Sequence, residues 1–163
     1  MKRLLRYTII FALGAVSFLN VSSNRDNSPL FTGGSFYVSP EMTSYVVKYF
    51  KMLDDAGIEY DRSQPIFVVF NNWEARGGVL GIAFGMYHDE YVNVHINREA
   101  WDYFTPEERE MVIFHELSHD VFNLVHGSIE LMRASKPATI DKEFLKKVNK
   151  ELIKHLKKMQ NGK

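Results

Sequence analysis

Two histidines lie four residues apart in the segment His115-Glu116-Leu117-Ser118-His119, which has the pattern H-E-x-x-H. Because a helix turns by about 100° per residue, side chains four positions apart share one face, and two imidazoles so placed can bind one metal ion. Glu116 lies about 100° round from His115, which suits a base better than a metal ligand. This combination is typical of zinc-dependent peptidases.

The residues around the motif predict a helix over about 106–123. Thr105 is a favoured N-cap, Pro106 suits the first helical position, and Glu108 completes a Thr-x-x-Glu capping box. Apolar residues recur at spacings of three and four and predict a face turned to the core: Met111, Phe114, Leu117, Val121 and Leu124.

A third metal ligand must come from beyond this helix. His126 lies eleven residues after His115, and Asn123 is a plausible left-handed residue at which the chain could turn back. Glu143, 24 residues past His119, is the alternative, because some zinc peptidases take a carboxylate ligand from a later helix. We favour His126 as the third ligand of one catalytic Zn²⁺, with a plain surface histidine as the other interpretation.

Two further residues are candidates for supporting roles. Asp120 could hydrogen-bond a ligand's free ring nitrogen or a nearby backbone group, and a solvent-facing helix acid is an equally good interpretation. Met132 lies six residues beyond His126 and is predicted to lie in a turn under the metal, although methionine is more often a core filler. The remaining histidines lack ligand spacing and are interpreted as surface or core residues: His88, His95 and His155.

The start of the chain has the pattern of a secretion signal. Three basic residues precede an uncharged, mostly apolar run, Tyr7–Leu19, and small residues near Ser23 suit cleavage. This run of thirteen residues is short for a membrane helix, which needs about 20, although an uncleaved anchor is the alternative. The sequence contains no cysteine, which excludes disulfides and a lipid-modified cysteine. We therefore expect a secreted or periplasmic protein that is not a lipoprotein.

The organisation predicted from these features is a signal peptide over 1–23, a flexible mature N-terminus over 24–39 and one domain over 40–163. The 140 residues left after the signal are enough for a hydrophobic core. The charge is uneven: residues 141–163 carry eight lysines and three acids, net +5, and residues 24–140 carry nine basic and 17 acidic residues, net −8.

The lysine-rich C-terminal segment is predicted to be a helix. Its apolar stripe consists of Phe144, Val148, Leu152, Leu156 and Met159. We interpret it as a terminal helix packed on the domain with a solvated lysine face, in preference to a membrane- or nucleic-acid-binding surface. No nucleic-acid motif is present, and we expect no nucleic-acid partner and no stable membrane span after signal cleavage.

The other elements predict an α+β domain with a small sheet. The segment Val79–Tyr87 is apolar and contains Gly81 and Gly85, so it is predicted to be a strand, at the edge of a cleft, that something approaches closely. The remaining predicted elements are a helix over Pro40–Ala56, strands over Ile66–Phe70 and Tyr91–Ile96, and a short helix over Asn97–Phe104.

The segment from His115 to His126 resembles the active-site sequence of the metzincins, whose pattern is H-E-x-x-H-x-x-G-x-x-H with a downstream Met-turn. The third histidine lies one residue later than in that pattern, and Asn123 stands one position past the place of the glycine. The spacing is more similar to a group of small bacterial secreted proteins with an H-E-L-G-H motif, where Ser118 here replaces the usual glycine. The resemblance covers about residues 105–133.

The resemblance implies a metzincin-like zinc metallopeptidase that acts on peptide or protein substrates. It implies that Glu116 is the general base, that Met132 underlies the site, and that the zinc ligands are His115, His119 and His126. Two other interpretations stay open: a secreted zinc-binding or adhesive domain without turnover, and a globular partner-binding protein with a chance motif. The sequence indicates no particular substrate or oligomeric state.

Overall fold

The computed structural model describes residues 35–72, 79–87 and 90–162. Four strands form a mixed sheet in the order β1-β2-β4-β3, in which β3 pairs antiparallel with β4 and the other pairings are parallel. The strands are β1 (Phe36–Val38), β2 (Ile66–Asn71), β3 (Gly81–Ala83) and β4 (Val92–Asn97). The sheet and the helices together confirm the predicted α+β class.

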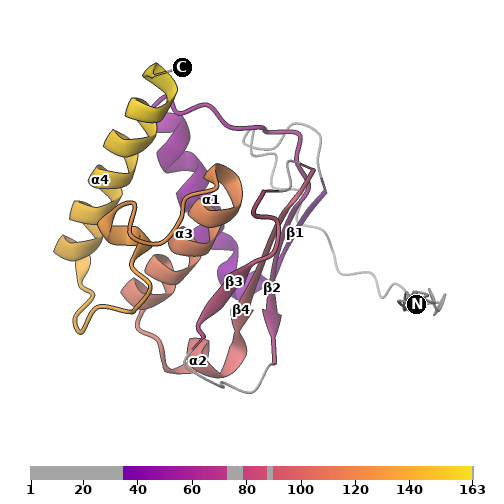
Figure 1. Ribbon diagram of the computed structural model, residues 1–163. Coiled ribbons are helices and arrows are strands. Elements are labelled where there is room, and N and C mark those ends of the chain that lie inside the picture. Colours follow the sequence, from indigo (N-terminus) through magenta and orange to yellow (C-terminus); the bar gives the residue numbers. More distant parts are fainter. Residues whose placement is uncertain (1–34, 73–78, 88–89, 163) are drawn as a thin grey trace, which may run out of the picture.

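Three long helices lie on the same side of the sheet (Figure 1): α1 (Pro40–Asp55), α3 (Pro106–Phe122) and α4 (Lys142–Asn161). A short helix, α2 (Arg98–Tyr103), links β4 to α3, and a single 3₁₀ turn, η1 (Glu130–Met132), lies between α3 and α4 in the chain. Helix α3 contacts β3, β4, α1, α4 and η1, so the helix that carries the H-E-x-x-H motif is the central one.

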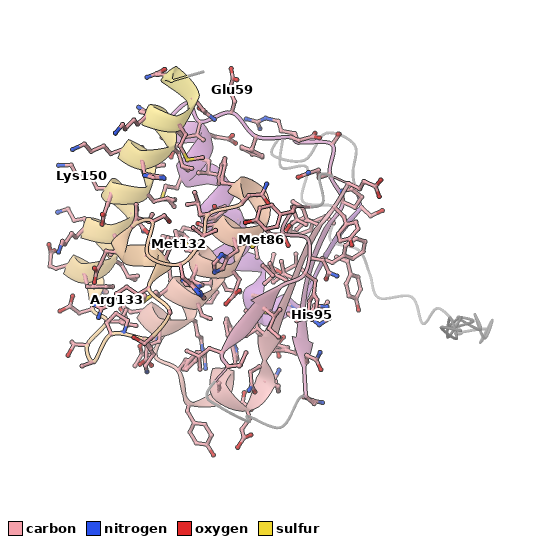
Figure 2. The ribbon with its side chains drawn as sticks, in the orientation of Figure 1. Glu59, Met86, His95, Met132, Arg133 and Lys150 are labelled. Atoms are coloured by element: carbon pink, nitrogen blue, oxygen red, sulfur yellow. The ribbon has the colours of Figure 1, made fainter. Side chains whose placement is uncertain are left out.

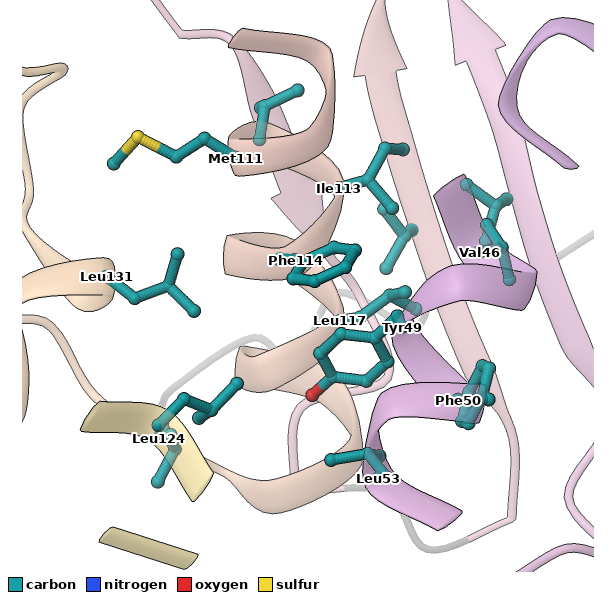
Figure 3. Close-up of a cluster of buried hydrophobic side chains, with 14 of the residues drawn as sticks. Val46, Tyr49, Phe50, Leu53, Met111, Ile113, Phe114, Leu117, Leu124 and Leu131 are labelled. Carbon is teal, nitrogen blue, oxygen red and sulfur yellow. The ribbon is translucent and has the colours of Figure 1, made fainter. Parts of the chain in front are cut away.

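The hydrophobic core lies on both sides of α3. Figure 3 shows Tyr49 and Leu53 of α1 facing Phe114 and Leu117 on one side of that helix, with Leu131 of η1 on the other. All five side chains are buried. Because neighbours enclose α3 in this way, Val112 and Ile113 are also buried, although both lie outside the apolar stripe predicted from the sequence.

Helix α3 begins and ends as predicted. The backbone N–H of Glu108 donates to the Thr105 hydroxyl (3.2 Å), and the Glu108 carboxylate accepts from the Thr105 N–H (2.9 Å), which completes the capping box. Asn123 follows the last helical residue with φ of 54°, in the left-handed region that turns a chain away from a helix axis. The local sequence thus determines both ends of the helix that carries the motif.

The N-terminal boundary of the domain differs from the prediction. We expected a flexible stretch over 24–39, but Phe36–Val38 form β1. This strand takes its backbone hydrogen-bond partners from Ile66–Val68 of β2, and the local sequence cannot indicate partners so far along the chain. The predicted signal peptide lies outside the described residues, as do residues 24–34. Within the described part of the chain, no helix combines the length and apolar content that a membrane crossing requires.

The buried stripe of α4 also differs from the prediction. Val148, Leu152 and Leu156 are buried as expected, and the fourth buried residue is Leu145. Phe144 is half-buried because it lies toward the border of the buried arc on a helix of 3.6 residues per turn. Met159 lies within that arc, but it is in the last turn of the helix and is 40% exposed.

Candidate metal centre

The structure brings the three predicted ligands together. His115 and His119 project from one face of α3, and His126 lies in the loop that follows the helix. The Nε2 atom of His115 is 3.0 Å from that of His119 and 3.2 Å from that of His126. One ring nitrogen from each residue lies within 4.8 Å of the others, so the group could hold a metal ion.

Hydrogen bonds to the backbone fix the orientation of two of these rings. Nδ1 of His115 donates to the carbonyl of Leu131 (2.8 Å), and Nδ1 of His119 donates to the carbonyl of Leu124. Because a carbonyl can only accept, each Nδ1 carries the ring proton and each Nε2 presents a lone pair. Such hydrogen bonds are the usual means by which a protein orients a metal-binding imidazole.

The resulting donor set fits a divalent metal ion. The Nε2 atoms of His115 and His119 are 3.0 Å apart. Neither carries a proton, so they cannot form a hydrogen bond and their lone pairs face each other. Two imidazole nitrogens bound to one zinc ion, each at about 2.0–2.1 Å in a tetrahedral arrangement, are about 3.4 Å apart. The observed separations approach this value, so a cation between the rings would satisfy lone pairs that otherwise repel each other.

The loop after α3 returns His126 to the helix. The N–H of Leu124 donates to the carbonyl of Ser118 (3.3 Å), and Leu124 is buried. Gly127 has φ of 82°, in the region that favours glycine, and its N–H donates to the carbonyl of Met132 (2.8 Å). Two short-range constraints therefore hold the segment that contains His126.

Turn η1 contacts two parts of the centre through its backbone. Its Leu131 carbonyl holds the His115 ring, and its Met132 carbonyl holds the loop next to His126. The Met132 side chain is fully buried in the hydrophobic core. Met132 thus lies in a turn that supports the three-histidine group and is also a core residue.

Glu116 lies in a buried position beside the histidine triad, which consists of His115, His119 and His126. Its side chain borders the same clefts as His126, and the residue is only 6% exposed. Burial, and to a smaller extent the nearby Asp120 carboxylate, raise the pKa of Glu116 to about 8. No residue in the described ranges donates a hydrogen bond to the Glu116 carboxylate, which leaves its oxygens available to water or a ligand in the cleft.

The two histidines of α3 are neutral at pH 7. Burial lowers the pKa of His115 to about 4, and the neighbouring imidazoles act in the same direction. Burial also lowers the pKa of His119. Only the neutral imidazole binds a metal, so the lowered pKa values extend the pH range in which both Nε2 atoms can bind one to more acidic values.

Two hollows in the surface, which together form one cleft, meet at the histidine triad. The larger, of about 500 Å³, contains His115 and is bordered by α3, the segment before β3 and the segment after η1. The smaller, of about 380 Å³, contains His119. Gly81, Glu116 and His126 line both, so the cleft continues past the metal centre along β3.

Asp120 binds backbone groups of β4 and of the segment after β3. It is buried, and its Oδ2 accepts from the N–H of Gly85 (2.8 Å) and the N–H of Asn93 (3.0 Å). This agrees with one of the two expected roles, whereas the solvent-facing interpretation was wrong. The Nδ1 atoms of His115 and His119 bind carbonyls instead, and Asp120 joins α3 to β4 and to the segment that follows β3.

The rival ligand and the other described histidines do not join the centre. Glu143 is exposed in the first turn of α4 and is not part of the metal-binding group. His95 contacts Asn71 and Asn93, and Figure 2 shows it on the sheet, away from α4. His155 lies on α4 outside the group, and His88 lies outside the described residues.

The two glycines are approached by acidic side chains of α3. A Cβ atom at Gly81 would lie 2.6 Å from Cγ of Glu116, and one at Gly85 would lie 2.3 Å from Oδ1 of Asp120 and 2.6 Å from the carbonyl oxygen of Tyr91. The predicted close approach is therefore present. Gly81 lines the cleft as expected, but Gly85 borders neither hollow and packs against Asp120.

Alanine at these two glycines is expected to have different consequences. Gly85→Ala should destabilise the fold by about 1–3 kcal/mol, because the new methyl group meets rigid backbone and a buried carboxylate. Gly81→Ala should displace the more adaptable Glu116 side chain and impair any activity that depends on it, with a smaller change in stability. Thermal unfolding and activity measurements on both variants test this, and equal effects on stability would contradict it.

No protein-family model, curated protein or solved structure matches this chain. The interpretation of the site therefore depends on its own geometry. The carbonyls of Leu124 and Leu131, which orient the rings of His119 and His115, are the main functional groups that the sequence did not indicate. Every residue has a carbonyl, so no residue type could have identified them.

Proposed function

We propose that this protein is a secreted zinc-dependent metallopeptidase that hydrolyses peptide bonds. One observation carries the proposal: three imidazoles present nitrogen atoms to one point in a cleft, and a buried glutamate lies beside them. Three histidine ligands with one open position are characteristic of catalytic zinc sites. Imidazole also binds copper, nickel and iron, so the three histidines do not select zinc by themselves. We infer zinc because a glutamate lies beside them, as in zinc-dependent peptidases.

His115, His119 and His126 would hold the ion, and Glu116 would move the proton. When bound, zinc supplies a Lewis acid that lowers the pKa of water and polarises a carbonyl group. The Glu116 carboxylate accepts one proton as water adds to the scissile carbonyl. It then donates that proton to the amine as the C–N bond breaks, which yields a carboxylic acid and an amine and restores the carboxylate.

Strand β3 could align an extended peptide in the cleft. Its neighbours Phe84 and Leu80 are hydrogen-bonded to β4, so by the alternation of antiparallel strands the backbone groups of Gly81 and Ala83 point to the open edge. Both residues border the cleft next to Glu116. A substrate that added a strand at this edge would form main-chain hydrogen bonds, which are independent of its side chains.

Proton release on metal binding is expected to depend on Glu116. In metal-free protein at pH 7 its carboxyl group is mostly protonated, because its pKa is about 8. A dication nearby favours the carboxylate, so zinc binding should release about one proton more from the wild type than from Glu116→Gln. Calorimetric titrations at pH 7 in buffers of different ionisation enthalpy measure the release. The difference should vanish above about pH 9, and its absence at pH 7 would contradict the assigned environment.

Digestion of a peptide library by the full chain tests the proposed function. We expect cleavage with zinc, loss of cleavage after chelation, and recovery when zinc is restored. A chain that binds one zinc ion but cleaves no peptide would instead be a zinc-binding domain without turnover. A chain that binds no zinc would indicate that the motif arose by chance.

A further inference from the structure

Seven lysines lie on one side of α4. At about 100° per residue they fall within an arc of about 160°, and all are exposed. The opposite side of the helix carries the apolar residues that pack on the domain. Figure 2 shows Lys150 pointing away from the rest of the molecule. We call this surface the lysine strip, and it consists of Lys142, Lys146, Lys147, Lys150, Lys154, Lys157 and Lys158.

The charge of the lysine strip is not neutralised within the domain. No lysine of the strip forms an ion pair with a residue that the structure describes. Every other described lysine and arginine has a partner: six pair with carboxylates, and Arg109 donates to the carbonyl of Trp101. With Glu143 and Glu151 included, α4 has seven basic and two acidic residues, a net charge of +5.

We propose that the lysine strip docks on the anionic surface of a phospholipid bilayer. This replaces the solvated face favoured from the sequence alone, because six of the seven other described basic side chains pair with carboxylates and, among the described residues, those of the strip do not. A helix of 20 residues is about 30 Å long, and its exposed side is a convex ridge that can lie along a flat surface. Lysine side chains are long and flexible, so their ammonium groups can reach headgroup phosphates without a fixed geometry. Basic clusters on helices are attracted to anionic lipids in this way.

A planar partner fits the charge distribution better than a nucleic acid does. Residues 24–140 carry a net charge of −8, so a polyanion that wrapped the domain would meet repulsion beyond α4. The aromatic rings of α4, Phe144 and His155, are half-buried and lie outside the lysine strip, which leaves no stacking platform for bases on the strip. A flat anionic surface needs to contact only the strip.

Sedimentation of the full chain with lipid vesicles tests this proposal. We compare vesicles that contain phosphatidylglycerol with vesicles of phosphatidylcholine alone and measure the ratio of the two partition coefficients. The apolar N-terminal segment is present in every protein compared, so its contribution is the same throughout. The strip variant replaces Lys147, Lys150 and Lys154 by glutamine. The control variant replaces Lys51, Arg62 and Arg98 by glutamine, which removes the same number of charges at positions that lie elsewhere and already have acidic partners.

The wild type is expected to prefer anionic vesicles, and salt should abolish the preference. Each lysine near the surface contributes about fivefold to binding, so the strip variant should lose on the order of 10²-fold and the control variant far less. Circular dichroism verifies that both variants are folded. Equal losses in the two variants would show that only net charge matters and would overturn the proposal. The absence of any preference in the wild type, or tighter binding to duplex DNA than to anionic vesicles, would also overturn it.

Discussion

Replacement of Glu116 by glutamine is expected to reduce peptide hydrolysis by about 10²–10⁴-fold while one zinc ion per chain is retained. Glutamine preserves the shape of the side chain but cannot accept the proton of water. Retention of the metal is expected because the three ring nitrogens that converge belong to other residues. Turnover of a cleavable library peptide and metal content are measured on the same preparation.

Glu107→Gln is a matched control, because Glu107 lies in the first turn of the same helix and lines neither hollow. We expect its hydrolytic rate to remain close to that of the wild type. Unchanged hydrolysis in Glu116→Gln would exclude a general-base role. Loss of zinc from a folded Glu116→Gln would identify Glu116 as a ligand.

A second large effect, on zinc affinity, is expected at His126, the proposed third ligand. His126→Ala should weaken zinc binding by more than the about 10–100-fold that follows loss of an outer hydrogen-bond partner, because it removes a direct ligand. Glu143→Ala should bind zinc as the wild type does, because Glu143 is exposed on α4 outside the group. Competition with a chromophoric chelator measures both affinities.

Circular dichroism on the metal-free variants separates loss of a ligand from loss of fold, since a bound metal also stabilises a protein. The opposite pattern, with zinc lost from Glu143→Ala and kept by His126→Ala, would replace the three-histidine site with a carboxylate site. Zinc retained by both variants would mean that the third ligand lies elsewhere.

The sequence predicted those parts of the fold that local rules determine. The capping box at Thr105 and the left-handed exit at Asn123 fixed the ends of α3, and the spacing of four residues placed His115 and His119 on one face. Alternation of apolar residues likewise predicted β4, where Val92, Val94 and Ile96 are buried. These features depend on neighbours only a few positions away.

Features that depend on distant partners could not be predicted in the same way. Strand β1 has three residues and takes its backbone partners from Ile66–Val68, about 30 residues further along the chain. Asp120 accepts hydrogen bonds from residues 27 and 35 positions earlier, so its surroundings follow from the packing of α3 on the sheet edge. Ile113 is buried because helices and sheet enclose α3, a property that no single helical face reveals.

The fold determines the protonation states of the side chains in the cleft, on which the proposed chemistry depends. Packing of α3 between the sheet and the other helices removes Glu116 from water and raises its pKa to about 8. The same burial lowers the pKa of His115 to about 4. In a metal-free cleft at pH 7, His115 and His119 are therefore neutral and Glu116 is mostly protonated, and arrival of a dication would favour the carboxylate.

The three imidazoles of His115, His119 and His126 are expected to bind one zinc ion together. The most direct test is X-ray absorption spectroscopy at the zinc edge on the full chain loaded with one equivalent of zinc. We predict three imidazole nitrogens at about 2.0–2.1 Å, together with one light-atom ligand at the open position. A spectrum dominated by carboxylate oxygens, or one with fewer than two imidazoles, would exclude a three-histidine zinc site.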